Sequence, residues 1–218
     1  MTLYHQIILT SSPQILNAQL SPLMRELHKD HSATFHFVEG ELDSLPGPGV
    51  EGFYEGPFFS YYKWPRSIHD DESSIQEAYN LLYETIEEDG PFDGILGFSH
   101  GGALAAGFLA YHATHNPHDS PLFRCAVFFN SVPPFQMKDD QTLVFEKEIE
   151  GKITLPTLHV VGKNDFVLVH SKRLYESCEG KSSAILMHDK GHEIPTKRKI
   201  VASIAAAIKD LSSRSMFL

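Results

Sequence analysis

The residues with the clearest chemistry lie at positions 97–101, which read Gly-Phe-Ser-His-Gly and match the G-x-S-x-G pentapeptide. A run that predicts a strand precedes them, and a small-residue run that predicts a helix follows directly. This context is typical of a nucleophile elbow, a strained turn that lifts the serine hydroxyl above the sheet and leaves no room for side chains at Gly97 or Gly101. Ser99 is therefore the candidate nucleophile. The backbone N–H of His100, at the start of the helix, is a candidate oxyanion donor, and this role does not need its imidazole ring.

A serine hydroxyl becomes a good nucleophile only when a base takes its proton, and that base must itself be oriented. After a nucleophile elbow the partners follow in the order Asp or Glu, then His, in loops that end strands. Asp165 fits this order because it lies in the turn 162–165, which closes a strand predicted at 157–161. An ordinary turn aspartate is the alternative interpretation. Asp139 and Asp140 are rival candidates, but no predicted strand delivers them.

The candidate base is His192, one of thirteen histidines. It lies in a loop after a strand predicted at 184–187, where Gly191 gives the backbone freedom and Pro195 is expected to open the last helix. His188 is a rival, although it lies at the end of the strand rather than in the loop. The i, i+4 spacing of these two histidines would suit zinc on a helix, but Gly191 and the flanking strand disfavour a helix there, so we expect no metal.

These residues need a scaffold of alternating strands and helices, and the sequence predicts one. Near-continuous apolar runs predict strands at 34–38, 92–98, 123–129, 157–161 and 184–187. Amphipathic or small-residue stretches predict helices opening at Ser12-Pro13 and kinked at Pro22, at 73–90 with a Ser73–Gln76 capping box, at 103–112, at 171–178 and from Pro195. This alternation predicts an α/β fold, a mainly parallel sheet with helices on both faces. No linker is visible, so we expect one domain over residues 1–218.

Two segments depart from this alternation. Residues 45–66 are rich in Pro and Gly yet carry seven aromatic residues, and residues 132–152 look irregular and charged. The aromatic segment is expected at least to be pinned onto the core by its rings. It is also a candidate wall of an apolar substrate pocket, with Phe53 and Tyr54 as possible substrate-binding residues. We therefore expect both segments to shape a pocket or lid.

Composition narrows the function classes. The formal net charge of −10 disfavours nucleic acid and anionic lipid surfaces as partners. Two cysteines are too few for disulfide bonds to stabilise a chain of 218 residues, and this low number suggests a reducing compartment. No signal peptide and no apolar run long enough to cross a membrane is visible, so the expected location is the cytoplasm.

Beyond the triad candidates, the chain resembles the FSH-type serine hydrolases, a family of α/β-hydrolases that includes fungal thioesterases and hydrolases of polyketide pathways. The resemblance covers nearly the whole chain and is specific only as a set. The residues that carry this resemblance are 12–16, 21–23, 46–49, 52–53, 56–57, 97–102, 162–167, Ser171, Leu174, Cys178 and 191–195. The resemblance implies the α/β-hydrolase fold, Ser99, Asp165 and His192 as a catalytic triad, and hydrolysis of an ester or thioester.

One departure concerns the second oxyanion donor. The family usually carries a His-Gly pair closing the first strand, and an ungapped comparison puts Ile7-Ile8 there. Because the donor is a backbone N–H, Leu9 or Thr10 is the candidate to supply it. Loss of one such donor typically costs about 100- to 1,000-fold in rate.

Two functions from different classes follow. The first is a serine hydrolase that needs no cofactor and acts on a small or carrier-bound acyl ester or thioester, in a fungal polyketide or other secondary-metabolite pathway. A synthase carrier domain is its candidate partner. The second is a non-hydrolytic protein on the same fold, either a cyclase or isomerase that uses His192 as a base or a catalytically silent binding protein.

Overall fold

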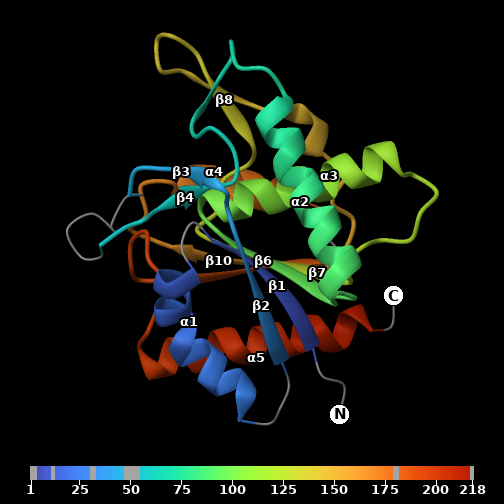
Figure 1. Ribbon diagram of the computed structural model, residues 1–218. Coiled ribbons are helices and arrows are strands. Elements are labelled where there is room, and N and C mark those ends of the chain that lie inside the picture. The colour runs from blue at the N-terminus through green and yellow to red at the C-terminus, as the bar shows by residue number, and fades with distance from the viewer. Residues whose placement is uncertain (1–3, 11–12, 30–32, 47–54, 179–181, 217–218) are drawn as a thin grey trace.

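The computed structural model describes residues 4–10, 13–29, 33–46, 55–178 and 182–216 (Figure 1). Its strands are β1 (Tyr4–Thr10), β2 (Ala33–Glu39), β3 (Leu42–Asp43), β4 (Phe59–Ser60), β5 (Arg66–Ser67), β6 (Gly94–Phe98), β7 (Cys125–Phe129), β8 (Phe135–Met137), β9 (Leu143–Phe145), β10 (Thr157–Gly162) and β11 (Ser183–His188). Its helices are α1 (Pro13–His28), α2 (Ser73–Asp89), α3 (His100–His115), α4 (Leu168–Ser177) and α5 (Arg198–Ser215), with a 3₁₀ turn at Lys147–Ile149.

The central sheet contains six strands in the order β11–β10–β7–β6–β1–β2, and every pairing in it is parallel. The predicted parallel sheet is confirmed. The chain adds β2 on one side of β1 and then places β6, β7, β10 and β11 in succession on the other side. The strand order therefore reverses between β1 and β6. Open α/β sheets bind ligands at the carboxyl ends of the strands beside such a switch point. Ser99 follows β6 directly and therefore lies there.

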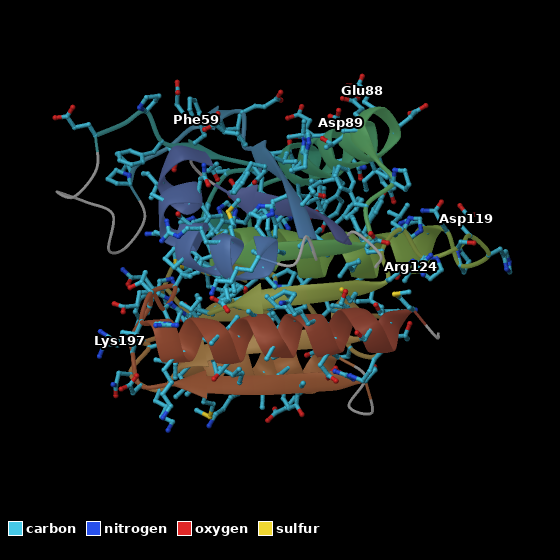
Figure 2. All side chains as sticks on the ribbon, turned by 90° about the horizontal axis from the view of Figure 1, so that it is seen from below. Phe59, Glu88, Asp89, Asp119, Arg124 and Lys197 are labelled. Atoms are coloured by element: carbon cyan, nitrogen blue, oxygen red, sulfur yellow. The ribbon has the colours of Figure 1, made fainter. Side chains whose placement is uncertain are left out.

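Helices cover both faces of this sheet. Alternate side chains of one strand enter different cores: Ile7 belongs to the core that includes residues of α2, α3 and α4, whereas Ile8 belongs to the core that includes residues of α1 and α5. The side view separates these layers (Figure 1), and the view from below shows α1 and α5 lying across the second face (Figure 2). Most of α3 is buried, which its glycines and alanines allow because α2 and the segment after β7 pack on it.

The two segments that interrupt the alternation contribute strands to two small sheets outside the central one. In the aromatic strap, which we define as residues 55–67, β4 pairs antiparallel with β3 and β5 pairs parallel with β8. The expectation that residues 132–152 are irregular is wrong, because β8 and β9 form an antiparallel hairpin there. Buried Arg66 links these parts: it pairs with Glu72, at the start of α2, at 2.5 Å and with Glu146, directly after β9, at 3.0 Å.

The five predicted central strands are confirmed to within two residues at each end, but α3 and α4 each begin three residues earlier than predicted, and the details of two other helix starts differ. The Ser73–Gln76 capping box is wrong: Glu72 is the N-cap residue, and the Ser73 hydroxyl bonds to Asp71 instead. The last helix begins at Arg198, three residues after Pro195. No helix in the described ranges has the length and hydrophobicity needed to cross a bilayer.

Candidate active site

Ser99 occupies the turn between β6 and α3 with φ 52° and ψ −114°. Positive φ is rare for a residue other than glycine, so this backbone is strained, as the nucleophile-elbow interpretation predicts. The neighbouring backbone stabilises the turn: the Ser99 N–H donates to the carbonyl of Phe129 at 2.9 Å. The Ser99 carbonyl in turn accepts from the N–H groups of Gly102 and Ala103, both at 3.1 Å.

The tightness of the elbow explains the glycine at position 97. A Cβ atom there would lie 2.5 Å from the carbonyl oxygen of Gly101 and 2.5 Å from the backbone of Gly102. Carbon atoms do not approach backbone atoms that closely without displacement. Any side chain at Gly97 would therefore push the first turn of α3 away from the strand and move Ser99 with it.

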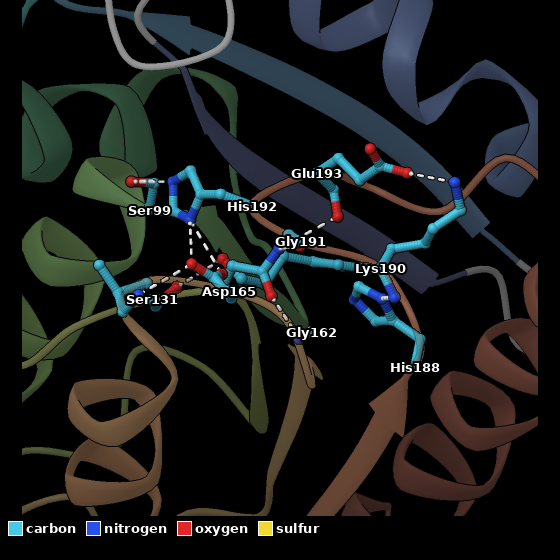
Figure 3. A network of polar contacts seen from close by, with 12 residues as sticks. Ser99, Ser131, Gly162, Asp165, His188, Lys190, Gly191, His192 and Glu193 are labelled. Atoms are coloured by element: carbon cyan, nitrogen blue, oxygen red, sulfur yellow. Dashed lines mark hydrogen bonds and ion pairs between the residues drawn. The ribbon is translucent and has the colours of Figure 1, made fainter.

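Three side chains from different strand ends meet at the elbow (Figure 3). The Ser99 Oγ atom lies 2.9 Å from Nε2 of His192. The opposite ring nitrogen, Nδ1, lies 2.9 and 3.0 Å from the two carboxylate oxygens of Asp165. These distances form a continuous chain of hydrogen bonds from hydroxyl to imidazole to carboxylate, the geometry in which a histidine can accept a serine proton.

The surroundings hold the imidazole in this position. The side chains of His192 and Asp165 are 8% and 1% exposed, so little water competes for their contact. The rings of Phe98 and Phe166 lie 5.0 and 4.8 Å from the His192 ring. The backbone N–H of Val167 donates to Asp165 at 2.9 Å and helps to orient its carboxylate.

The rival residues lie elsewhere. Asp139 is exposed and contacts the exposed ring of His69, and Asp140 accepts from the backbone N–H of Thr142 at 3.0 Å. The hydrogen bonds from Thr142 lower the pKa of Asp140. His188 is buried beside the loop, where its Nδ1 accepts from the N–H of Lys190 at 3.3 Å and burial lowers its pKa. None of these three side chains has a contact with Ser99 among the described interactions.

His100 follows the nucleophile, but its ring points into the aromatic strap. It stacks on Trp64 at a centroid distance of 4.1 Å and packs edge-on against Tyr62 at 4.7 Å. Burial lowers the pKa of His100 to about 3, so the ring is neutral at physiological pH and cannot serve as an acid there. Its backbone N–H belongs to the first turn of α3, where N–H groups have no acceptor within the helix. It can therefore donate a hydrogen bond to an oxyanion.

The second oxyanion donor remains a prediction. Leu9 is in register with Gly97 of β6, so the end of β1 lies next to the strand that leads into the elbow. Ile7 and Ile8 are buried within β1 rather than at its end. Phe53 and Tyr54, expected to contact substrate, lie outside the described residues.

No group of three or more His, Cys, Asp and Glu side chains converges in a metal-binding arrangement within the described part of the chain. Sequence reasoning missed Phe166, which packs on His192, and Asn130, which follows β7 and bonds to the His192 loop. The only sequence signal for Asn130 is a polar residue directly after a buried strand, and that pattern is common.

Comparison with known proteins shows the family to which the chain belongs. Residues 9–204 match the family model described as serine hydrolase (FSH1). The chain is 43% identical over 208 residues to the hydrolase phiM of Talaromyces stipitatus, covering 91% of this chain and 82% of that protein. It is 32% identical over 212 residues to the esterase FPY3 of Fusarium mangiferae, covering 94% of each.

Solved structures share the fold. Carboxyl esterase 2 of Tuber melanosporum superposes with a TM-score of 0.61 at 14% identity, covering 97% of this chain and 78% of that one. At this identity the likeness concerns the architecture, which is that of an α/β-hydrolase. With the family match over most of its length and fungal hydrolases and esterases among its relatives, the chain belongs to the FSH1 serine hydrolase family.

Proposed function

We propose that the chain hydrolyses acyl esters or thioesters through a catalytic triad of Ser99, His192 and Asp165. The observation that carries the proposal is the hydrogen-bond chain from Ser99 Oγ through His192 to Asp165, with contacts of 2.9 to 3.0 Å. The strained elbow supports it, because such a turn exposes the hydroxyl at a helix N-terminus. The serine hydrolase family supplies the reaction class.

In the first half-reaction, Ser99 Oγ attacks the acyl carbonyl carbon while its proton passes to Nε2 of His192. The resulting imidazolium donates from Nδ1 to Asp165, whose carboxylate stabilises the charge. The oxyanion of the tetrahedral intermediate accepts from the N–H of His100 and from a second donor at Leu9 or Thr10. Collapse of the intermediate breaks the bond to the alcohol or thiol, which leaves with the proton from His192.

In the second half-reaction, water replaces the leaving group. His192 takes a proton from the water as its oxygen bonds to the acyl carbon, and a second tetrahedral intermediate forms. Its collapse breaks the bond to Ser99 Oγ, which recovers its proton from His192. The products are a carboxylic acid and the regenerated enzyme.

We further propose that the acyl group is apolar and belongs to a polyketide or other secondary metabolite, presented free or on a carrier domain. The rings of Phe98 and Phe166 beside His192 support an apolar acyl group. Phe166 is 68% exposed, so its ring is accessible to a substrate next to the reacting atoms. The resemblance to fungal polyketide-pathway hydrolases supports the pathway. Thioester and oxygen-ester substrates share the same acyl-enzyme chemistry.

A fluorophosphonate probe tests the triad directly. We expect the probe to label the wild-type protein, and Ser99→Ala to abolish both labelling and hydrolysis of p-nitrophenyl acetate while the melting temperature stays near that of the wild type. If folded wild-type protein is neither labelled nor active on esters or acyl thioesters, the proposal is wrong. Continued labelling of Ser99→Ala would place the nucleophile at another residue.

The acyl preference needs its own measurement. A series of p-nitrophenyl esters with lengthening acyl chains should show kcat/KM rising with chain length, and Phe166→Ser should reduce that rise more than it reduces turnover of the acetate. A flat series in the wild type would argue against an apolar acyl pocket while leaving the triad unaffected.

A further inference from the structure

Asn130, the first residue after β7, combines three features that ordinary packing does not explain. It is 0% exposed, its side chain is an amide, and its φ of 45° lies in the left-handed region. Asparagine tolerates this region better than most residues, but the conformation still carries strain. Strain and burial at a polar residue beside a candidate site suggest that the side chain has a specific task.

The amide of Asn130 is fully used, and its contacts lie on two different loops. Its Oδ1 accepts from the backbone N–H of Gly162 at 2.9 Å, where the loop to Asp165 begins. Its Nδ2 donates to the carbonyl of Glu193 at 3.0 Å and to that of Gly191 at 3.4 Å. The acceptor faces an N–H and the donors face carbonyls, so the orientation of the amide is unambiguous.

The two accepting carbonyls belong to the residues on either side of His192, which Figure 3 shows beside Gly162 and Asp165. The backbone extends the connection: Phe129, the residue before Asn130, accepts from the N–H of Ser99, and Asn130 itself donates to Val160. Residues 129 and 130 are therefore hydrogen-bonded to Ser99 and to both partner loops.

We propose that Asn130 is a positioning residue that holds the His192 loop at its working distance from Asp165 and Ser99. It acts through backbone groups and touches neither the reacting atoms nor the substrate. The proposal rests on the triad proposed above. Without the amide, the carbonyl of Glu193 loses this donor, the carbonyl of Gly191 keeps the N–H of Glu193, and the N–H of Gly162 loses its acceptor, so the side-chain bridge between the two loops is gone. A displacement of about 1 Å at a catalytic group can cost about 100-fold in rate.

The test uses two variants of Asn130 that remove the donor in different ways. Asn130→Gly suits the positive φ and deletes the amide, whereas Asn130→Asp keeps the shape but turns an oxygen toward the two carbonyls. We expect both to lower kcat on p-nitrophenyl acetate by about 100-fold with KM nearly unchanged. We also expect the low-field proton NMR resonance of His192 Nδ1 to broaden or disappear, because its bond to Asp165 is no longer maintained.

Thr157→Val is the matched control. Thr157 is also fully buried, and its Oγ1 bonds to Ser183 at 2.8 Å and to His159 at 3.0 Å, but it lies at the other end of β10 from Gly162. This variant should lower the melting temperature by a similar amount and keep both kcat and the NMR resonance. Comparison of the Thr157 and Asn130 variants therefore separates a general loss of stability from a displacement of the His192 loop.

Two results overturn the proposal. In one, both Asn130 variants keep wild-type kcat and the low-field resonance. In the other, both fail to fold while Thr157→Val folds, which would make Asn130 a residue of general stability. The triad is tested separately. An active Ser99→Ala variant would contradict the proposed triad, whereas an inactive Ser99→Ala variant together with active Asn130 variants would contradict only the proposed role of Asn130.

Discussion

Two histidines flank Ser99, and the regions that hold them differ in kind. His192 lies in a loop held by directional hydrogen bonds: to Asp165, to Ser99, and through its neighbours' carbonyls to Asn130. His100 lies under the aromatic strap, where its ring packs on Trp64 and Tyr62, and its buried Nε2 has no partner among the described residues.

The contrast separates two ways of holding a histidine ring. Proton transfer needs donor and acceptor atoms at fixed distances and angles, which hydrogen bonds provide because they weaken steeply when misaligned. The strap has only to keep its rings packed on the core, and ring packing supplies apolar contact area with little directional demand. Changes in the His192 loop should therefore reduce kcat more than stability, and changes in the strap should reduce stability more than kcat.

The largest effect should come from Asp165→Asn, with kcat lower by about 10⁴-fold and the melting temperature little changed. The amide can donate to Nδ1 of His192, which favours the tautomer whose Nε2 already carries a proton and cannot accept one from Ser99. Steady-state kinetics measure the change. Asp139→Asn, at an exposed carboxylate, is the control and should behave as wild type. A loss of less than tenfold in Asp165→Asn would mean that the carboxylate is not needed for orientation.

Next, Gly162→Ala should lower kcat by about 100-fold, because the His192 loop must move by a fraction of an ångström or more. The new Cβ would lie 2.4 Å from the carbonyl oxygen of Gly191 and 2.5 Å from that of Lys190. Gly151→Ala is a useful comparison, since Gly151 has φ 69° and open space around it. That variant should lose about 1 to 2 kcal/mol of stability and no activity. Equal activity losses in both would contradict the loop-displacement explanation, because a Cβ atom at Gly151 meets no neighbouring atom within 4 Å.

A third prediction concerns acid. Burial lowers the pKa of His100 and that of His159 to about 3, well below the ordinary value of 6.5. Between pH 6.5 and 3 the unfolded chain takes up protons that the folded chain does not, so the free energy of unfolding falls as the pH falls through this range. Each residue contributes a slope of about 1.4 kcal/mol per pH unit.

His100→Phe tests this in the strap. Phenylalanine keeps the ring contact with Trp64 but cannot take up a proton, so urea unfolding between pH 4 and 7 should show a shallower dependence than in the wild type. The kcat at pH 7 should change by no more than a few-fold, because the proposed mechanism uses only the backbone N–H of this residue. An unchanged slope would show that His100 is accessible to protons in the folded state.

The smallest effect on turnover should come from Trp64→Phe in the strap. The smaller ring loses part of its contact with His100 and Phe135, and we expect a loss of about 1 to 3 kcal/mol in the free energy of unfolding. The kcat on p-nitrophenyl acetate should stay close to that of the wild type. A large fall in kcat with unchanged stability would contradict the division between the two regions.

Much of the fold and the candidate site could be predicted from local patterns. The pentapeptide around Ser99 identified the elbow because only glycines fit its tight turn. Five of the six central strands were recognised because each is a short, near-continuous apolar run, whereas β1 was located only through the family resemblance. Helix starts were less predictable: the Ser73–Gln76 pattern resembles a capping box, yet Asp71 provides the partner of the Ser73 hydroxyl.

The hairpin β8–β9 was missed for a similar reason. Its strands are three residues long, and its pairing with β5 joins residues far apart in the chain. Strands this short have no periodicity to detect. Asn130 was missed because its importance lies in its partners, Gly162, Gly191 and Glu193, none of which is near it in sequence.

By itself, the sequence determined the strand–elbow–helix unit at Ser99, the alternation that produces a parallel sheet, and the order in which Asp165 and His192 follow. Local backbone geometry and hydrophobic periodicity suffice for the first two, and the order of the partners follows from the architecture that a nucleophile elbow indicates. Only the tertiary structure decided that His192 lies 2.9 Å from Ser99, that the His100 ring turns into the strap, and that Asn130 bridges two loops. These depend on strand register and on contacts between distant segments, which no local pattern encodes.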